Sequence, residues 1–471
     1  MSQPSCGRDE RVDEPKPMST NLIATPGRPL PEKGAERLEP THGPNGCPQE
    51  TVKPDPGAAR AKPTPVISVI VPVRNGGANL RLCLASLLDS DFSDYEVIVV
   101  DDASTDDTAE TAVALGARVV RLPRQGGPAN ARNLGAEVGR GEYLLFIDAD
   151  VCVAPETLSQ VFVAFARDPG LDAVFGSYDR RPRARNWLSQ YKNLFHHYIH
   201  QQGRERATTF WSGCGAIKRS VFAELGGFKA EFNRPSIEDI ELGARLLKAG
   251  RNILLDKQLL VTHLKRWTFR GIVQTDVLDR AIPWTELLLQ QRALPDDLNL
   301  RISQRISALL AFGLFALYVA GAWFFPWLLL APVLGVLGIL LLDYWSGRED
   351  RGLAFKAVAG AVVVGACAAL GFYCGARPLL GLPLVAGIVL LNFRFYAFLV
   401  KERHVLFAAL VVPLHVFYYL YSVLAFGLGC WLYLWHGTLR RLFPNRNNRP
   451  ADAQRACLMQ PPSSRATIWM P

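Results

Sequence analysis

The sequence predicts an α/β domain followed by an all-α transmembrane domain, and two observations lead to this prediction. Short β-branched runs alternate with helix-like stretches between residues 65 and 300, which is typical of βαβ units and a parallel sheet. From residue 303 to 440 the chain is strongly apolar and carries few charges, which is typical of membrane-spanning helices. A length of 471 residues also exceeds one ordinary domain.

Residues 1–64 are rich in proline, glycine and charged side chains. Such a segment buries too little apolar surface to offset its chain entropy, so we expect a disordered N-terminal arm, with partner binding as the alternative. The nine cysteines form no CxxC pair and no zinc-like cluster. This usage indicates a reducing compartment, and the N-terminus lacks a signal-peptide pattern. We therefore expect the part before the first membrane segment to be cytoplasmic.

The α/β domain, predicted over residues 65–300, begins with four strands separated by three helices. The strands are expected at 67–73, 95–100, 117–122 and 143–147, and the helices at 79–88, 105–115 and 128–138. The carboxyl ends of parallel strands meet at one edge of a sheet. Functional side chains are therefore expected where these strands end.

The apolar region, residues 303–440, is predicted to hold about four membrane spans. Residues 306–345 contain one charge, Asp343, and are interrupted by an aromatic-proline turn at 323–327. Further candidates are 354–374, the marginal 379–393, and the long 405–435. Residues 441–471 are expected to be a disordered cytoplasmic tail.

The positive charges do not fit four simple spans. Arginines in the 348–351 linker, in the C-terminal tail, and in the cluster of Arg394, Lys401 and Arg403 all favour the cytoplasmic side. They cannot all lie there if every candidate crosses. We therefore expect the segment around 379–399 to lie in the membrane interface or to re-enter.

Pairs of carboxylates follow two of the predicted strands. Asp101 and Asp102 end the second strand, and Asp148 and Asp150 end the fourth. Carboxylate oxygens at such an edge suit a hard divalent cation that also binds phosphate oxygens. Aspartate-rich surface loops are the alternative, although the equivalent positions of the two pairs make it less attractive.

Four successive motifs resemble those of family 2 glycosyltransferases with the GT-A fold. They are VPVRN at 71–75, VDDAS at 100–104, ARN at 131–133 and DAD at 148–150, and the resemblance extends over about residues 66–290. It implies a membrane-anchored, bacterial-type member of the family. Such an enzyme would be an inverting transferase that uses a nucleotide-diphosphate sugar as donor.

The resemblance implies a set of nucleotide contacts: Pro72, Arg74, Asp101, Asp102 and Arg132. It further implies that Asp148 contacts the nucleoside or the metal. Asp150 is expected to ligate Mg²⁺ or Mn²⁺ that bridges the two phosphates and neutralises the departing nucleoside diphosphate.

The acceptor half is expected around the Glu238–Asp239 pair. The pair resembles the catalytic acidic dyad of the family, which implies that Asp239 is the general base for an acceptor hydroxyl. An N-terminal helix-dipole partner is the alternative role for these acids.

The HLKRW sequence at 263–267 has the ending of the QxxRW motif of membrane-linked family members, with His263 where glutamine is usual. Arg266 suits the diphosphate by charge, and Trp267 suits a sugar face by stacking. Because histidine replaces the glutamine, the motif does not determine whether the usual hydrogen bond of that glutamine forms, or whether synthesis is processive. A basic interfacial stretch is the alternative.

These motifs together predict an inverting glycosyltransferase acting on a membrane-associated acceptor, lipid-linked or saccharide. It would be an integral protein of a bacterial inner or plasma membrane with its catalytic domain in the cytoplasm. The net charge of +9 is explained by arginines and lysines that are expected to lie at the bilayer surface and at the diphosphate site. Membrane lipids rather than nucleic acid are therefore the expected partners. The motifs do not identify the donor sugar, the base or any protein partner.

Three other classes of protein are less consistent with the sequence. A processive polysaccharide synthase is disfavoured by the missing glutamine and by the lack of a hydrophobic span before the catalytic domain. An inactive scaffold or transporter is disfavoured because Asp102, Asp150 and Asp239 are all present. A Rossmann dehydrogenase would carry G-x-G-x-x-G after its first strand, and this chain does not.

Overall fold

The computed structural model describes residues 64–292, 297–324, 337–338, 340–341, 343–344, 381–442 and 468–469. Almost all of the predicted N-terminal arm, the expected span at 354–374 and most of the C-terminal tail lie outside the described residues. The predicted domain boundaries stay predictions.

The first half of the α/β domain has the predicted strands and helices. Strands β1 (Ile67–Val73), β2 (Tyr95–Asp101), β3 (Arg118–Arg121) and β4 (Tyr143–Ile147) run parallel in the order β3-β2-β1-β4. Helices α1 (Gly77–Leu88), α2 (Thr108–Ala114) and α3 (Pro128–Val138) connect them. Nearly every side chain of β1 and β4 is buried on both faces of the sheet, which explains their continuous apolar sequences.

The first four strands are parallel as predicted, and the second half of the domain makes the sheet mixed. The strands of this second half are β5 (Val151–Cys152), β6 (Ala173–Tyr178), β7 (Cys214–Lys218) and β8 (Ile253–His263), with β9 (Ile468–Trp469) at the edge. Strand β7 lies antiparallel between β4 and β6, while β6 and β8 are parallel. The long connection after β6 begins and ends at the same edge of the sheet, which reverses the direction of β7. The order is β5-β8-β6-β7-β4-β1-β2-β3-β9.

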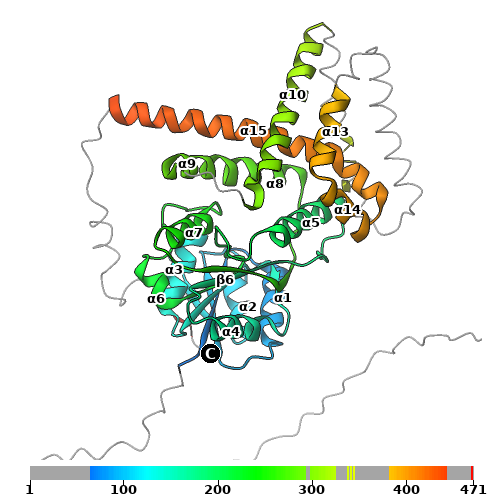
Figure 1. Ribbon diagram of the computed structural model, residues 1–471. Helices are drawn as coiled ribbons and strands as arrows, with labels where there is room; N and C mark the ends of the chain where they lie inside the picture. Colours follow the sequence, from blue (N-terminus) through cyan, green and yellow to red (C-terminus); the bar gives the residue numbers. More distant parts are fainter. Residues whose placement is uncertain are drawn as a thin grey trace, which may run out of the picture. The chain divides into compact units, whose positions relative to one another are not determined.

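The remaining helices of the α/β domain pack around this sheet (Figure 1). They are α4 (Thr157–Arg167), α5 (Trp187–Gln202), α6 (Arg219–Glu224) and α7 (Glu238–Lys248). A nearly continuous helical segment follows β8: α8 (Phe269–Gln274), the π-helix η1 (Thr275–Ala281) and α9 (Ile282–Gln291), and then the short 3-10 helix η2 (Leu298–Leu300).

The C-terminal region consists of apolar helices of membrane-spanning character. They are α10 (Ile302–Phe324), α13 (Leu382–Leu391), α14 (Phe393–Glu402) and α15 (Val405–Leu442). Within the described residues, Ile302–Ala320 and Val405–Trp435 are each long and apolar enough to cross a membrane, and α13 with α14 is a third candidate bent by 70°. Two to three such helices indicate membrane anchoring. The expected span at 354–374 lies outside the described residues, and after the turn at 323–327 the structure describes only 337–338, 340–341 and 343–344 of the apolar segment that ends at 345.

The bend between α13 and α14 is held by the buried side chain of Asn392. Its Nδ2 donates to Ser307 Oγ at 2.9 Å and to the carbonyl of Ile388 at 2.8 Å. Its Oδ1 accepts from the Tyr419 hydroxyl at 2.9 Å and from Gln304 at 3.1 Å. A satisfied polar network stabilises a helix break among apolar neighbours. A break of this kind occurs both in a bent span and in a re-entrant segment, so the expectation for 379–399 stays a prediction.

An apolar cluster joins the α/β domain to these helices. From α5 and the segment after β8 it takes Trp187, Leu188, Tyr191, Phe195 and Trp267, and from α14 and α15 it takes Phe395, Leu399, Val411 and Leu414. Figure 1 shows α5 beside α14, in agreement with their direct contacts. The α/β domain and the apolar helices therefore share one core.

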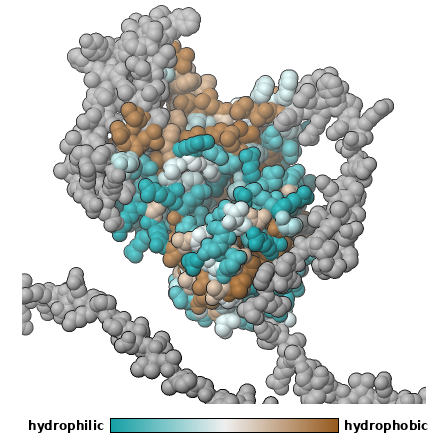
Figure 2. Space-filling view, turned by 180° about the vertical axis from the view of Figure 1, so that it is seen from behind, coloured by the Kyte–Doolittle hydropathy of each residue, from teal (hydrophilic) through white to brown (hydrophobic). Residues whose placement is uncertain are grey.

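Apolar side chains also cover the outside of the helical part. Figure 2 shows brown surface gathered there, whereas the α/β domain carries many hydrophilic side chains. Among the exposed residues are Leu309, Leu390 and Trp431, with exposed fractions of 67%, 71% and 56%. An apolar surface of this extent is typical of contact with a membrane.

Candidate active site

The two aspartates after β2 hold the loops at the edge of the sheet. Asp101 is fully buried; its Oδ1 accepts from the amide of Ser104 at 2.8 Å, and its Oδ2 lies 3.2 Å from Nε of Arg121. Asp102 accepts from the amides of Gly126 and Gly127 at 2.6 and 3.0 Å. Both carboxylates are therefore engaged by the protein, and direct nucleotide contacts by them stay predictions.

Gly127 is needed for the loop that Asp102 holds. Its φ of +84° lies in the left-handed region, and a Cβ there would overlap the backbone of Asn233. Only glycine combines this conformation with so close an approach. The glycine-rich loop is thereby fixed between Asp102 and the segment that precedes α7.

The end of β1 lies beside the same turn. Pro72 is partly buried within the strand and Arg74 is exposed just after it. Asn75 follows with φ of 52°; its amide donates to Ser104 Oγ and its Oδ1 accepts from the amide of Thr105, both at 2.9 Å. Arg74 thus stands at a well-fixed strand end, as a nucleotide contact requires.

Arg132 joins the two acidic motifs. This buried side chain donates from Nη2 to Asp148 Oδ1 at 2.7 Å and from Nη1 to Glu238 Oε1 at 2.8 Å. The structure therefore brings the DAD motif and the Glu238–Asp239 pair together, as the resemblance implies. Both terminal nitrogens of Arg132 are used in this bridge. Arg132 therefore holds the carboxylates of Asp148 and Glu238 in position, a role that the sequence did not reveal.

Asp148 and Asp150 meet the requirements of a divalent-cation site. Each carboxylate side chain is about one-third exposed (32%), and only Oδ1 of Asp148 is held by Arg132. Among the described residues no three Asp, Glu, His or Cys side chains converge. A hard cation here would take the rest of its ligands from water and the donor phosphates, as Mg²⁺ commonly does. The residues therefore fit Mg²⁺ or Mn²⁺.

His263 stands against this acidic pair. Its Nε2 lies 3.6 Å from Asp150 Oδ2, and its ring stacks on Tyr178 with centroids 4.1 Å apart. Burial raises the pKa of Asp150, but the proximity of His263 and Lys265 outweighs it and leaves that pKa below its usual value. The histidine of the altered QxxRW motif thus contacts the predicted metal ligand.

The last two residues of that motif have different environments. Arg266 is exposed, which leaves it available for the diphosphate. Trp267 is only 7% exposed and packs in the cluster with α5; its amide donates to Ser189 Oγ at 2.7 Å. The burial of this indole is at odds with the predicted sugar stacking. The ring instead fills the joint between the catalytic domain and the helices.

The predicted general base lies at the start of α7. Oδ2 of Asp239 accepts from the amide of Ser212 at 3.2 Å, and Oδ1 accepts from the amide of Ile240 at 2.8 Å. Burial and the charge of Glu238 raise the pKa of Asp239 to about 6, although Arg132 opposes them. Glu238 itself is locked by Arg132 and by the amide of Ser236 at 2.8 Å. The two acids thus differ: Glu238 is structural, and Asp239 suits proton transfer near neutral pH.

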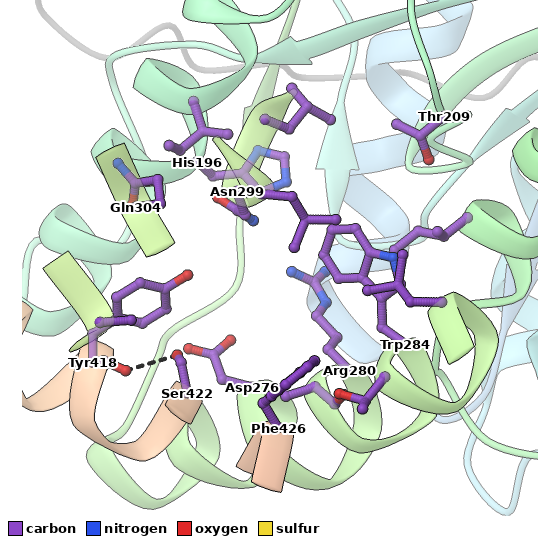
Figure 3. Close-up of a pocket in the computed structure, with 18 of the residues that line it drawn as sticks. His196, Thr209, Asp276, Arg280, Trp284, Asn299, Gln304, Tyr418, Ser422 and Phe426 are labelled. Atoms are coloured by element: carbon purple, nitrogen blue, oxygen red, sulfur yellow. Dashed lines mark hydrogen bonds between the residues drawn. The ribbon is translucent and has the colours of Figure 1, made fainter. Parts of the chain in front are cut away.

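Asp239 opens into a cavity of about 460 Å³ between the α/β domain and the apolar helices. Its walls come from α5, α7, η1, α9, η2, α10 and α15 (Figure 3). This volume lies in the range of about 300–1,000 Å³ that is usual for small-molecule sites.

Sequence reasoning missed the polar residues of this cavity. Lys192 and Asp276 form a buried ion pair, with Nζ 2.6 Å from both carboxylate oxygens. His196 and Arg280 also line the cavity. The sequence does not reveal this cavity, because nothing local shows which residues of α5 and η1 meet.

A half-sheet of parallel strands, a DAD motif at a strand end and an acidic dyad joined to it by Arg132 are features of a GT-A-like domain. Here the domain is followed by apolar helices. Residues 68–226 match the family described as Glycosyl transferase family 2. This segment of the α/β domain is therefore similar to glycosyl transferase family 2.

Individual relatives resemble parts of the chain. It is 34% identical to Glycosyltransferase GlyG of Streptococcus pneumoniae over 118 residues, 24% of this chain and 39% of that protein. It is 27% identical to an uncharacterized glycosyltransferase of Haemophilus influenzae over 45% of this chain and 72% of the relative. The chain thus spans well under half the length of GlyG.

One solved structure is similar over most of the chain. It is the mannosyltransferase PcManGT from Pyrobaculum calidifontis in complex with GDP-Man and Mn²⁺, with 20% identity and a TM-score of 0.40. The similarity covers 74% of this chain and 87% of PcManGT.

Proposed function

We propose that this protein is an inverting glycosyltransferase that moves a sugar from a nucleotide-diphosphate donor to a membrane-associated acceptor, lipid-linked or saccharide. The observation that carries the proposal is the Arg132 bridge, which holds the DAD motif and the acidic dyad together in one site. The acidic, hydrogen-bonded surroundings of Asp239, open to a cavity beside the apolar helices, support the acceptor side.

The donor is proposed to bind at the edge formed by the ends of β1, β2 and β4. Pro72 and Arg74 would face the nucleotide, and Arg266 would add positive charge at the diphosphate. Asp150, with Asp148 beside it, would hold Mg²⁺ or Mn²⁺, which neutralises charge on the departing diphosphate when bound. Mn²⁺ and GDP-Man accompany the similar PcManGT structure.

Asp239 is proposed to take the proton from the acceptor hydroxyl. Its Oδ2 is oriented by the Ser212 amide at 3.2 Å, and its raised pKa matches a base that works near neutral pH. The acceptor oxygen bonds to the anomeric carbon on the face opposite the diphosphate, and the bond to the diphosphate breaks with its electron pair. Displacement from the opposite face inverts the configuration.

Purified full-length protein tests this proposal by a screen of nucleotide-diphosphate sugars for metal-dependent hydrolysis. We expect one donor to be hydrolysed with Mg²⁺ or Mn²⁺, and the Asp150→Asn variant to lose most of that activity. Asp91→Asn, an exposed position, is the matched control. Absence of hydrolysis and of thermal stabilisation with every donor would contradict the proposal.

The membrane location is part of the same proposal. Two to three apolar helices support anchoring, and the basic residues at their ends favour a catalytic domain on the cytoplasmic face. Cysteine labelling from either side of sealed vesicles would test the orientation.

A further inference from the structure

The cavity at Asp239 connects the proposed base with the membrane-facing part of the chain. Asp239 contributes from α7, whereas Leu309 comes from α10 and Phe426 from α15, the two long candidate spans. Between them, Trp284 and Leu288 of α9 add apolar surface. A molecule in this cavity would therefore touch the reaction site at one end and the hydrocarbon-facing helices at the other.

Arg280 supplies a positive charge to this cavity, where it acts at a distance on the carboxylates of Asp239 and Asp279 and opposes the rise in their pKa that burial causes. It makes no hydrogen bond or ion pair within the part of the chain that the structure describes. Figure 3 shows its guanidinium directed into the open space near Trp284 and Asn299. Of the other cations of the wall, Lys192 is paired with Asp276, and Arg305 donates from Nε to the carbonyl of Leu300 at 2.7 Å. A partly buried cation whose hydrogen-bond donors are unused favours an anionic occupant.

Further polar atoms in the cavity lack partners. Nδ1 of His196 and Oδ1 of Asn299 are buried without a hydrogen bond in the described structure. Burial lowers the pKa of His196 well below its usual value, so its neutral ring can accept or donate a hydrogen bond. Buried polar atoms are normally satisfied, so these two indicate a polar headgroup in the occupant.

We infer that the acceptor is an anionic lipid whose headgroup carries a phosphate and a free hydroxyl. Its phosphate would bind Arg280, its hydroxyl would face Asp239, and its hydrocarbon chains would lie along Trp284, Leu288, Leu309 and Phe426. This inference rests on the proposed function, since it names the acceptor of that same reaction.

The charges and atoms of the transfer balance with this acceptor. The lipid hydroxyl gives its proton to Asp239, its oxygen bonds to the anomeric carbon of the donor, and the nucleoside diphosphate leaves with the electron pair. The lipid phosphate takes no part in bond making. A general base is needed because the nucleophile is a hydroxyl, whereas an ionised phosphate oxygen would need none.

Four purified lipids separate the requirements for charge and hydroxyl. Full-length protein in phosphatidylcholine nanodiscs would receive phosphatidylglycerol or phosphatidylinositol, which carry both groups, phosphatidic acid, which lacks the headgroup hydroxyl, or diacylglycerol, which lacks the phosphate. The donor is the labelled sugar nucleotide found by the hydrolysis screen. We expect labelled, organic-soluble product from the first two lipids only.

Two pairs of variants test the site itself. Arg280→Ala should raise the KM for phosphatidylglycerol about 10- to 100-fold, as loss of a charge-assisted hydrogen bond predicts. Arg270→Ala, an exposed arginine in α8, is the control. Ala308→Phe fills the cavity and should weaken lipid use, whereas Ala316→Phe, exposed on the same helix, should not.

Several results would overturn this inference. They are equal transfer to diacylglycerol, transfer only to a soluble saccharide, normal donor hydrolysis without any lipid product, or equal effects of Arg280→Ala and Arg270→Ala. Failure of the proposed function gives a different pattern. Donor hydrolysis would then be absent, while phosphatidylglycerol would still raise the unfolding temperature of the wild type and not of Arg280→Ala.

Discussion

The buried ion pair of Lys192 and Asp276 joins the catalytic domain to helix α15, and its removal should have a large, pH-dependent effect. Nζ lies 2.6 Å from both oxygens of Asp276, and the Tyr421 hydroxyl donates to Oδ2 at 2.7 Å. The two side chains are 9% and 8% exposed. Asp276→Asn keeps the shape and removes only the negative charge.

The cost follows from the burial of Lys192. Breaking a buried pair on one side costs about 3–5 kcal/mol. Losing the proton instead costs about 4–5 kcal/mol near pH 7, from an unperturbed lysine pKa of about 10.4 and about 1.36 kcal/mol per unit. Burial already lowers the pKa of Lys192, even with Asp276 present. Whether Lys192 stays charged without a partner or loses its proton, the variant therefore loses a large part of a typical folding free energy of about 5–15 kcal/mol.

The sign of the pH dependence is specific to this mechanism. In Asp276→Asn, folded Lys192 has a lower pKa than unfolded Lys192, so the unfolded state binds more protons and stability rises with pH. The gain is about 1.4 kcal/mol per unit up to a pH of about 10. Lys192→Met with Asp276→Leu should recover most of the loss, short of about 1 kcal/mol for the Tyr421 hydroxyl.

Thermal unfolding followed by circular dichroism in one detergent, at about pH 7 and about pH 9, measures these effects. Asp107→Asn is the control, because its pair with Arg81 is exposed (64% and 58%) and worth at most about 1 kcal/mol. Equal unfolding temperatures for Asp276→Asn and the control, or a deficit that does not shrink at the higher pH, would refute the reasoning.

Three other predictions concern the catalytic half. Because the pKa of Asp239 is raised to about 6 and the base acts deprotonated, kcat/KM should fall about tenfold per unit below that pH. A profile that is flat from about pH 5 to about pH 8 would contradict this assignment. Arg132→Met should lower stability by about 3–5 kcal/mol and abolish donor hydrolysis, because it leaves Asp148 and Glu238 unpaired. The exposed Arg140→Met should change little, and similar unfolding temperatures for both would count against the bridge. Gly127→Ala should weaken nucleotide binding in calorimetry far more than Gly250→Ala, since both glycines have positive φ but only Gly127 abuts another backbone. Equal affinities would show that the loop is not held as described.

Local patterns were sufficient to predict the first four strands and three helices. Each strand is a short apolar run with a buried centre or end, and β1 and β4 are buried almost throughout, so the sequence pattern and the fold agree. The motifs after β2 and β4 were predicted to meet at one edge because the carboxyl ends of parallel strands lie at the same edge of a sheet. Arg132 confirms the closeness of the DAD motif and the acidic pair, because it contacts both.

The rest depended on contacts between distant residues. Arg132 and Glu238 are 106 positions apart, and Lys192 and Asp276 are 84 apart. No local pattern shows that an arginine after a glycine-rich loop will bridge two acids. The burial of Trp267 was unexpected for the same reason: a motif assigns it to a sugar, and only the packing of α5 and α14 shows that it lies in their apolar cluster. The reversed direction of β7 likewise follows from a long connection and not from its sequence.

Asp239 is proposed to be the base of a glycosyl transfer, whereas the donor is proposed to bind at the ends of β1, β2 and β4. The most direct test compares Asp239→Asn with wild type for sugar transfer and for nucleotide-sugar binding on the same preparation, with Asp91→Asn as the control. The account predicts that transfer falls about 10²- to 10⁴-fold, the usual contribution of a general base, while donor affinity stays nearly unchanged. Undiminished transfer by Asp239→Asn would contradict it.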